Sequence, residues 1–177
     1  FCEVSVRDSF EKSFQKMLKA CEFNKELGLK MKTARYFSDL KGSANLYLYA
    51  GTLNEMNLPE KSIDAVITDP PYGSNVQYLE LSHFWHPWNK DLYEKKSIDF
   101  AKEAVVNRKK DLKNAKTYKT YEDSLSEVFL ETHRVLKDGG KIVMTFNNKD
   151  LKAWLALLIS VFRSGYHFEK GGITFQD

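Results

Sequence analysis

The chain has 177 residues, 42% of them hydrophobic and 14% aromatic, which excludes a disordered chain and suits one globular domain with a core. Its 27 basic and 24 acidic residues leave a net charge of +3, which permits an anionic partner without requiring one. No apolar run approaches the roughly 20 residues of a membrane span, so no membrane partner is expected. Two cysteines, Cys2 and Cys21, are too few for a disulfide framework and favour a reducing, cytoplasmic location.

The first part of the chain predicts one helix and one strand. Residues 1–42 form an N-terminal helical segment, in which Asp8 or Ser9 is placed to cap an amphipathic helix. The apolar face of this helix comprises Phe10, Phe14, Met17, Leu18 and Cys21. An alternating run over 46–50 predicts a strand that ends at Gly51.

The middle of the chain is less regular. A strand is expected over 63–68, and its nearly continuous apolar character indicates burial on both faces. Residues 73–119 have poor periodicity and are interpreted as an inserted loop region. Regularity returns with a helical face between Leu125 and Leu136, which Lys137-Asp138-Gly139-Gly140 is predicted to end as a cap.

The last elements are a strand over 141–146, a helix over 151–162 that ends near Gly165, and a strand pair or strand and turn within 166–175. Alternation of strands and helices predicts an α/β sheet with helices on its faces. In such sheets ligands bind at the carboxyl ends of the strands. The run Asp69-Pro70-Pro71-Tyr72 lies at one such end.

This run, called the 69–72 turn below, has the groups needed to methylate an exocyclic amino group of a base. Such an amine is a poor nucleophile, because its lone pair is delocalised into the ring. The Asp69 carboxylate and the Pro70 carbonyl could accept its two hydrogens and turn the lone pair toward a sulfonium methyl donor. Pro71 keeps Pro70 extended and adds no competing N–H. The ring of Tyr72 offers a face for a base rotated out of its stack.

The 69–72 turn resembles the signature of amino-directed DNA methyltransferases. The continuation Asn75-Val76-Gln77-Tyr78-Leu79-Glu80-Leu81-Ser82, followed by Phe84, is similar to the run found in adenine-specific (N6) members. Residues 103–107 and 134–140 are similar to later landmarks of the same group. The resemblance therefore spans most of the chain from the first strand to the last helix. It implies a Rossmann-like fold that uses S-adenosylmethionine, with adenine N6 in DNA as the methyl acceptor.

The resemblance also implies roles for the matching positions. Asp69, Pro70 and Tyr72 would hold the target base, and Asp69 would approach the S-adenosylmethionine cofactor. Gly51 and Thr52 would lie beside the adenine of the cofactor, although family members often carry Asp where this chain has Thr52. The residues expected to line the substrate side are Asn75, Tyr78, Phe84 and Asn107.

One part of the family pattern is not found in the chain. Members bind S-adenosylmethionine through a loop of the form Asp-Pro-Phe-x-Gly-x-Gly, followed by an acidic residue that holds the ribose. Gly139-Gly140 and Gly171-Gly172 are better interpreted as a helix cap and a turn. The fold is therefore expected to be incomplete, with its first strands and this loop preceding Phe1 or belonging to a companion chain. The chain alone is expected to bind the cofactor weakly or not at all.

Two further signals are weaker. The segment 101–119 holds seven basic residues, which form either a solvated face or a phosphate-binding surface that includes Lys109 and Lys110. His83 and His86 stand three apart, but no cysteine or acidic cluster completes a metal site, so aromatic packing is favoured and no metal is expected.

Three alternative functions remain open at this point. An RNA base or free nucleobase could replace DNA as the substrate. A protein-glutamine methyltransferase is disfavoured by Asp69, because those enzymes characteristically have Asn at the first position of the tetrapeptide. A non-catalytic nucleic-acid-binding module is disfavoured by the presence of both Asp69 and Tyr72.

Overall fold

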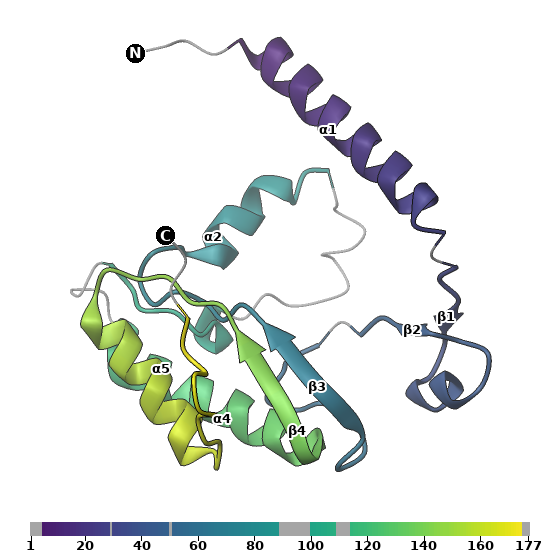
Figure 1. The fold of residues 1–177 in the computed structure, drawn as a ribbon. Helices are drawn as coiled ribbons and strands as arrows, with labels where there is room; N and C mark the ends of the chain where they lie inside the picture. Colours follow the sequence, from purple (N-terminus) through teal and green to yellow (C-terminus); the bar gives the residue numbers. More distant parts are fainter. Residues whose placement is uncertain (1–4, 29, 50, 89–99, 109–113, 175–177) are drawn as a thin grey trace. The chain divides into compact units, whose positions relative to one another are not determined.

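The computed structural model describes residues 5–28, 30–49, 51–88, 100–108 and 114–174 (Figure 1). The chain divides into two compact units, Phe1–Ala50 and Gly51–Asp177. All predicted site residues belong to the second unit. In the described part of the chain, no helix is both long and apolar enough to cross a membrane.

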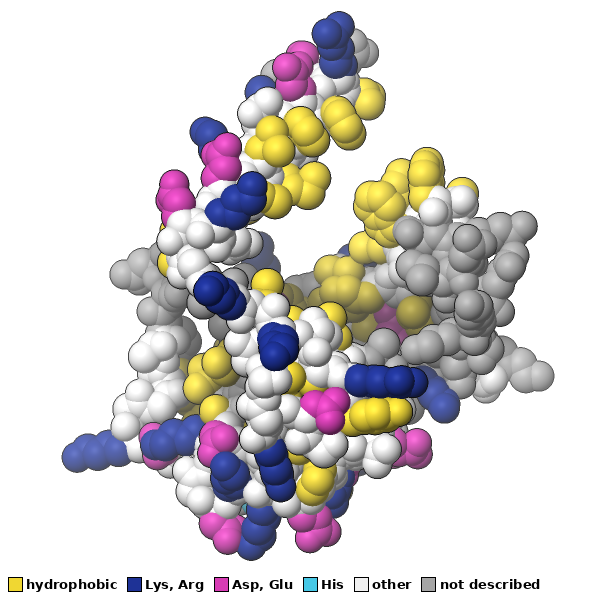
Figure 2. Space-filling model, turned by 90° about the vertical axis from the view of Figure 1, so that its right-hand side faces the viewer, with side chains coloured by type: hydrophobic (Ala, Val, Ile, Leu, Met, Phe, Trp, Pro, Cys, Tyr) yellow, Lys and Arg dark blue, Asp and Glu magenta, His cyan; other side chains and the backbone are white. Residues whose placement is uncertain are grey.

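The first unit begins with helix α1 (Val6–Glu26), which confirms the predicted amphipathic helix. The predicted cap at Asp8 or Ser9 is wrong, because the helix starts earlier and the Ser5 hydroxyl accepts the Asp8 N–H at 3.4 Å. No residue of α1 is buried. Figure 2 shows hydrophobic side chains gathered along one side of this helix and charged side chains along another.

The rest of the first unit is a small parallel strand pair. Strand β1 (Thr33–Ala34) pairs with β2 (Leu46–Tyr47), and the 3-10 helix η1 (Phe37–Lys41) connects them. The strand expected over 46–50 is therefore only two residues long. Leu48, inside the predicted strand, is 71% exposed, so it has no packing partner that would extend the pairing.

The second unit is built on a parallel pair of strands, β3 (Ile63–Thr68) and β4 (Leu136–Met144). Helix α4 (Tyr118–Val135) precedes β4, and helix α5 (Leu151–Arg163) follows it. Ile67 pairs with Val143 and Thr68 with Met144, so the two strands end at the same level. The predictions of a strand over 63–68 and a helix over 151–162 are confirmed.

Helices α4 and α5 cover one face of the strand pair (Figure 1). Val66, Ile142 and Met144 point to this face and pack against the buried core. That core comprises Val106, Tyr121, Leu125, Phe129, Leu136, Ala156, Leu157, Val161 and Tyr166. Alternation along the strands thus places every second residue under the helices.

The opposite face of the pair is open within the described residues. Ile67 is 84% exposed and Val143 is 57% exposed, and the two are partners in the register. The expectation that residues 63–68 are buried on both faces is therefore wrong. The apolar run is continuous, but the described helices lie on one face only.

The junction of α4 and β4 also differs from the prediction. Helix α4 ends at Val135 and the strand starts at Leu136, so Lys137-Asp138-Gly139-Gly140 is not a helix cap. Residues 137–140 instead form a bulge opposite the single residue Asp64. A Cβ at Gly140 would lie 2.9 Å from the Asp64 carbonyl oxygen, which explains the glycine.

The remaining segments are short or irregular. Residues 73–119 contain helix α2 (Tyr78–Ser82) and the 3-10 helices η2 (His83–Trp85) and η3 (Phe100–Lys102), in line with the expected lack of long elements before α4. The strand predicted within 166–175, as one of a pair or with its turn, is wrong for the part described, since residues 166–174 contain no strand. The turn predicted at Gly171-Gly172 is confirmed, and the Gly172 N–H donates to the Glu169 carbonyl at 2.9 Å. Tyr166 instead packs in the core, edge-on to Phe129.

Candidate active site

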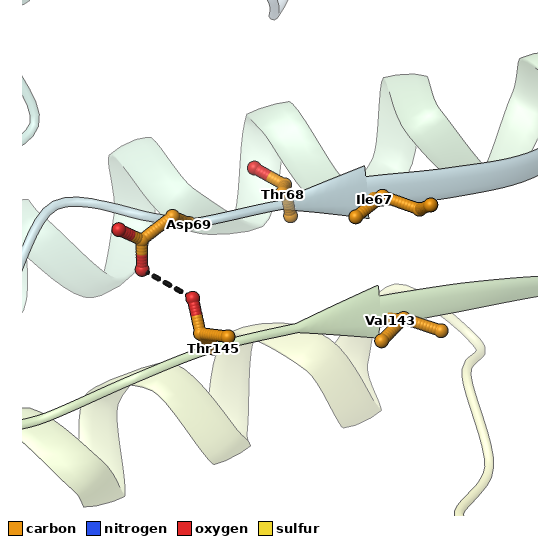
Figure 3. Close-up of a pocket in the computed structure, with 5 residues that line it drawn as sticks. All are labelled: Ile67, Thr68, Asp69, Val143 and Thr145. Carbon is orange, nitrogen blue, oxygen red and sulfur yellow. Dashed lines mark hydrogen bonds between the residues drawn. The ribbon is translucent and has the colours of Figure 1, made fainter. Parts of the chain in front are cut away.

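The carboxyl ends of β3 and β4 place two polar residues side by side. Asp69 directly follows β3 and Thr145 directly follows β4, and the Thr145 N–H donates to the Thr68 carbonyl at 3.2 Å. Their side chains extend the open face of Ile67 and Val143, as Figure 3 shows. These four residues and Thr68 line a shallow cavity of about 300 Å³. Of the predicted site residues, Asp69 lines this cavity.

The Asp69 carboxylate is held by two hydroxyl groups on one oxygen. Its Oδ1 accepts a hydrogen bond from Thr145 at 2.6 Å and another from Tyr72 at 2.5 Å. These bonds hold the pKa of Asp69 below its usual range, and the bond from Thr145 has the larger effect. Asp69 is exposed and lines the cavity, and no described residue donates a hydrogen bond to its other oxygen, Oδ2.

Two backbone carbonyls of the 69–72 turn, those of Asp69 and Pro70, receive no hydrogen bond from a described residue, and Pro70 itself is buried. The next carbonyl, that of Pro71, accepts the hydroxyl of Tyr121, a side chain only 1% exposed. An ionised carboxylate and a carbonyl without a donor thus stand on adjacent residues.

Tyr72 is fixed at both ends of its side chain. Its hydroxyl donates to Asp69, and this bond raises the pKa of Tyr72. The edge of its ring contacts Phe146, at 5.3 Å between centroids and 81° between planes. Phe146 is supported in turn by Trp154 of α5. The ring therefore stands on an aromatic support, and its stacking on a base stays a prediction.

Gly73 allows the turn to pack tightly against α5. It has a φ of +58°, and an added Cβ would lie 3.2 Å from Ala153 and 3.3 Å from Asn148. Asn148 donates to the Tyr72 carbonyl at 2.9 Å, and the Val106 N–H donates to the Gly73 carbonyl at 3.1 Å. Hydrogen bonds from two separate parts of the chain therefore fix the turn and the glycine that follows it.

The residues predicted on the substrate side fall into two groups. Tyr78 is 41% exposed and Phe84 is 64% exposed, and Phe84 lies in an aromatic cluster with Trp85 and Trp88. Asn75 and Asn107, in contrast, make hydrogen bonds within the protein: the Asn75 amide donates to the Asn147 carbonyl at 3.4 Å, and the Asn107 amide bonds within the loop.

Further hydrogen bonds of Asn75 and Asn107 connect positions within the loop. The Asn107 amide donates to Gln77 at 3.1 Å and accepts the Lys116 N–H at 2.7 Å. Arg108 donates to the carbonyl of Asn75 at 2.5 Å. These contacts order the segment after the turn. Lys109 and Lys110 lie outside the described residues.

The predicted cofactor residues other than Asp69 do not line the cavity. Gly51 and Thr52 are exposed, and the Thr52 hydroxyl donates to Asn54. Asn54 in turn donates to Glu127 of α4 at 3.0 Å. The placement of Gly51 and Thr52 beside a cofactor stays a prediction.

His83 and His86 lie with their ring centroids 4.8 Å apart, and the edge of His83 contacts Phe100. Within the described residues, no group of histidine, cysteine or acidic side chains is arranged to hold a metal ion. The two histidines therefore belong to an aromatic contact.

Sequence reasoning missed Thr145, Tyr121 and Asn148, all of which contact the 69–72 turn. Thr145 was placed inside a strand predicted over 141–146, whereas β4 ends at Met144 and leaves it at the strand end. The sequence signal available for Thr145 was its position after the second predicted parallel strand, since neighbouring parallel strands end at the same edge.

A comparison with protein families matches residues 63–176 to a family described as DNA methylase. The matched region contains β3, the 69–72 turn, the cavity and both covering helices. Comparisons with curated proteins and with solved structures gave no match. Because the family match covers more than half of the chain and includes the whole site, the chain belongs to the DNA methylase family.

Proposed function

We propose that this protein transfers a methyl group from S-adenosylmethionine to the N6 amino group of adenine in DNA, and that the 69–72 turn binds the amine. Family membership supports DNA methylation as the overall activity. The observation that carries the finer proposal is the pair of acceptors on adjacent residues. The Asp69 carboxylate and the Pro70 carbonyl both stand at the carboxyl end of β3.

In this proposal the two acceptors act on the two hydrogens of the amine. Asp69 and the Pro70 carbonyl each accept one hydrogen, which draws the nitrogen out of conjugation and directs its lone pair. When bound, S-adenosylmethionine supplies a methyl group on a sulfonium, which leaves with the electron pair of the carbon–sulfur bond. The nitrogen forms the new bond to carbon and then loses one proton to solvent. Because its pKa is lowered, Asp69 serves as a hydrogen-bond acceptor throughout.

The rings near the turn supply a surface for the base. Tyr72 stands supported by Phe146, while Tyr78 and Phe84 are exposed. Aromatic faces bind bases by stacking, which contributes about 1–3 kcal/mol per base. We propose that a base rotated out of the DNA duplex lies between the cavity and these rings.

The residues of the cavity fit one end of the cofactor. Ile67 and Val143 form apolar walls that suit a methyl group, and Asp69 gives a negative charge that suits a sulfonium. We propose that the glycine-rich loop and further strands of a Rossmann-like fold come from another part of the protein or from a companion chain. The exposure of Ile67 and Val143 supports this, because parallel sheets are normally covered on both faces.

The test is a methyl-transfer assay on the complete gene product that contains this chain. Unmethylated DNA is incubated with the protein and S-adenosylmethionine, then digested to nucleosides and analysed by mass spectrometry. We expect N6-methyladenine in DNA. N4-methylcytosine, or methylation of RNA alone, would refute the proposed acceptor.

The Asp69→Ala variant should be folded and inactive, because the exposed carboxylate acts on the amine and supports little of the core. Asp64→Ala is the matched control, since Asp64 is an exposed aspartate of the same strand that pairs with Lys137 at the surface. It should keep its activity. Methyl transfer by folded Asp69→Ala at the control's rate would contradict the assignment.

A further inference from the structure

The hydroxyl of Thr145 makes a contact that the backbone of β4 does not require. The pairing of the strand ends is completed by the Thr145 N–H, which donates to the Thr68 carbonyl at 3.2 Å. The side chain separately donates to Asp69 Oδ1 at 2.6 Å, across the gap between the strand ends (Figure 3). A substitution that removes only the hydroxyl of Thr145 can therefore abolish its contact with Asp69 and keep the backbone hydrogen bond to Thr68.

Both hydrogen bonds to the Asp69 carboxylate reach the same oxygen. Thr145 and Tyr72 donate to Oδ1, and no described residue donates to Oδ2. One donor directly follows the neighbouring strand β4 and the other belongs to the turn itself, so Oδ1 is held from two sides. This arrangement leaves Oδ2 as the oxygen that can receive a hydrogen from outside the protein.

We propose that Thr145 is a positioning residue that holds Asp69 through Oδ1 and so presents Oδ2 to the amino group of the target base. The proposal rests on the function proposed above and adds a residue from a second strand to it. Tyr72 gives a different constraint, because it belongs to the same turn as Asp69, whereas Thr145 belongs to a separate part of the chain. Through Thr145 the position of the carboxylate depends on β4. The register of β4 with β3 is set by the residue pairs Ala65–Lys141 to Thr68–Met144.

The charge state of Asp69 agrees with this role. The hydrogen bond from Thr145 is the largest cause of its lowered pKa, followed by that from Tyr72, while desolvation acts in the opposite direction. No charged side chain of the described residues contributes to the shift. The titratable group that acts on Asp69 is Tyr72, and Tyr78 acts in turn on Tyr72. Removal of the Thr145 hydroxyl should therefore raise the pKa of Asp69.

The experiment compares Thr145→Val and Thr145→Ser in the complete gene product. Valine keeps the branched shape and the backbone donor of threonine but has no hydroxyl, whereas serine keeps the hydroxyl. Thr33→Val is the matched control, because Thr33 is an exposed strand threonine of the first unit. The readouts are kcat and KM for DNA, the pH dependence of kcat, and the pKa of Asp69 from an NMR titration of its ¹³C-labelled carboxyl group.

We expect Thr145→Val to lower kcat roughly 10- to 100-fold, the range for a hydrogen bond to a charged group, with little change in KM for DNA. The acid limb of its kcat profile and the Asp69 titration should both move to higher pH. Thr145→Ser should recover most of the rate, and Thr33→Val should match the parent.

An unchanged Asp69 titration together with an unchanged kcat in Thr145→Val would overturn the proposal, and so would failure of serine to restore either property. If the parent protein transfers no methyl group to DNA, the proposed function fails. The NMR titration still decides whether Thr145 controls the carboxylate.

Discussion

Removal of the buried hydroxyl of Tyr121 should loosen the 69–72 turn, and it should leave no cavity in the core because the ring stays in place. Tyr121 of α4 is 1% exposed and donates its hydroxyl to the Pro71 carbonyl. Tyr121→Phe keeps the ring in the core and leaves that carbonyl, on a half-buried residue, without its donor. The expected cost is about 1–2 kcal/mol of unfolding free energy, the lower part of the range for an unsatisfied polar group. For a chain of this length it corresponds to a fall in Tm of roughly 2–8 °C.

The effect on catalysis depends on how much of this energy positions the turn. If about 1 kcal/mol is lost in the transition state, kcat falls about fivefold. Tyr166→Phe is the matched control, because the buried Tyr166 donates its hydroxyl to Thr132 at 3.0 Å, away from the turn. Both variants are measured by urea denaturation and by methyl transfer at a temperature where they are fully folded. Equal kcat values for the two would refute the reasoning and show that the turn is held without Tyr121.

Two more perturbations test the surroundings of the turn and the stability of the second unit. Gly73→Ala should lower the unfolding free energy by at least about 1–2 kcal/mol, the cost of a left-handed non-glycine residue. Gly28→Ala is the control, because Gly28 has a φ of +61° but no atom within 4 Å of the added Cβ, and its loss of unfolding free energy should be smaller. If urea denaturation shows equal losses for the two variants, the contacts of the added Cβ with Ala153 and Asn148 contribute nothing. The hydrogen bond from Arg134 holds the pKa of Glu131 below its usual range, so the ionised form stabilises the fold above the unfolded pKa, and this contribution is lost as pH falls through the folded pKa. Glu131→Gln should therefore lower Tm at neutral pH and match the parent in acid; a Tm deficit that does not vary with pH would contradict this.

The sequence predicted those parts of the fold that have a local signal. The apolar run over 63–68, the helical face of residues 151–162 and the 69–72 turn are each recognisable from adjacent residues, and β3 and α5 lie where expected. The contacts around the turn are not local. Thr145, Tyr121 and Asn148 reach it from 50 or more positions away, and only the register of β3 with β4 and the packing of α4 and α5 bring them there.

Two errors came from signals with more than one meaning. Gly139-Gly140 suits a helix cap and equally suits a bulge that must pass close to the Asp64 carbonyl. The apolar run over 63–68 is typical of a strand covered on both sides, but the covering of each face depends on other segments. Ile67 is exposed because the described helices of the second unit pack on the other face.

The bulge in β4 lies at the end of the strand pair that is remote from the candidate site. Residues 137–140 stand opposite Asp64 alone, and the surface pairs Lys61–Asp138 and Lys137–Asp64 close the loop. Beyond it, the pairing resumes at Lys141 and continues unbroken to the strand ends. A residue gained or lost at the tip alters the arc of the bulge and leaves the strand ends in register. The tip at Gly139, where an added Cβ would meet no atom within 4 Å, can therefore carry a peptide tag or a fluorophore that reports on the protein during turnover.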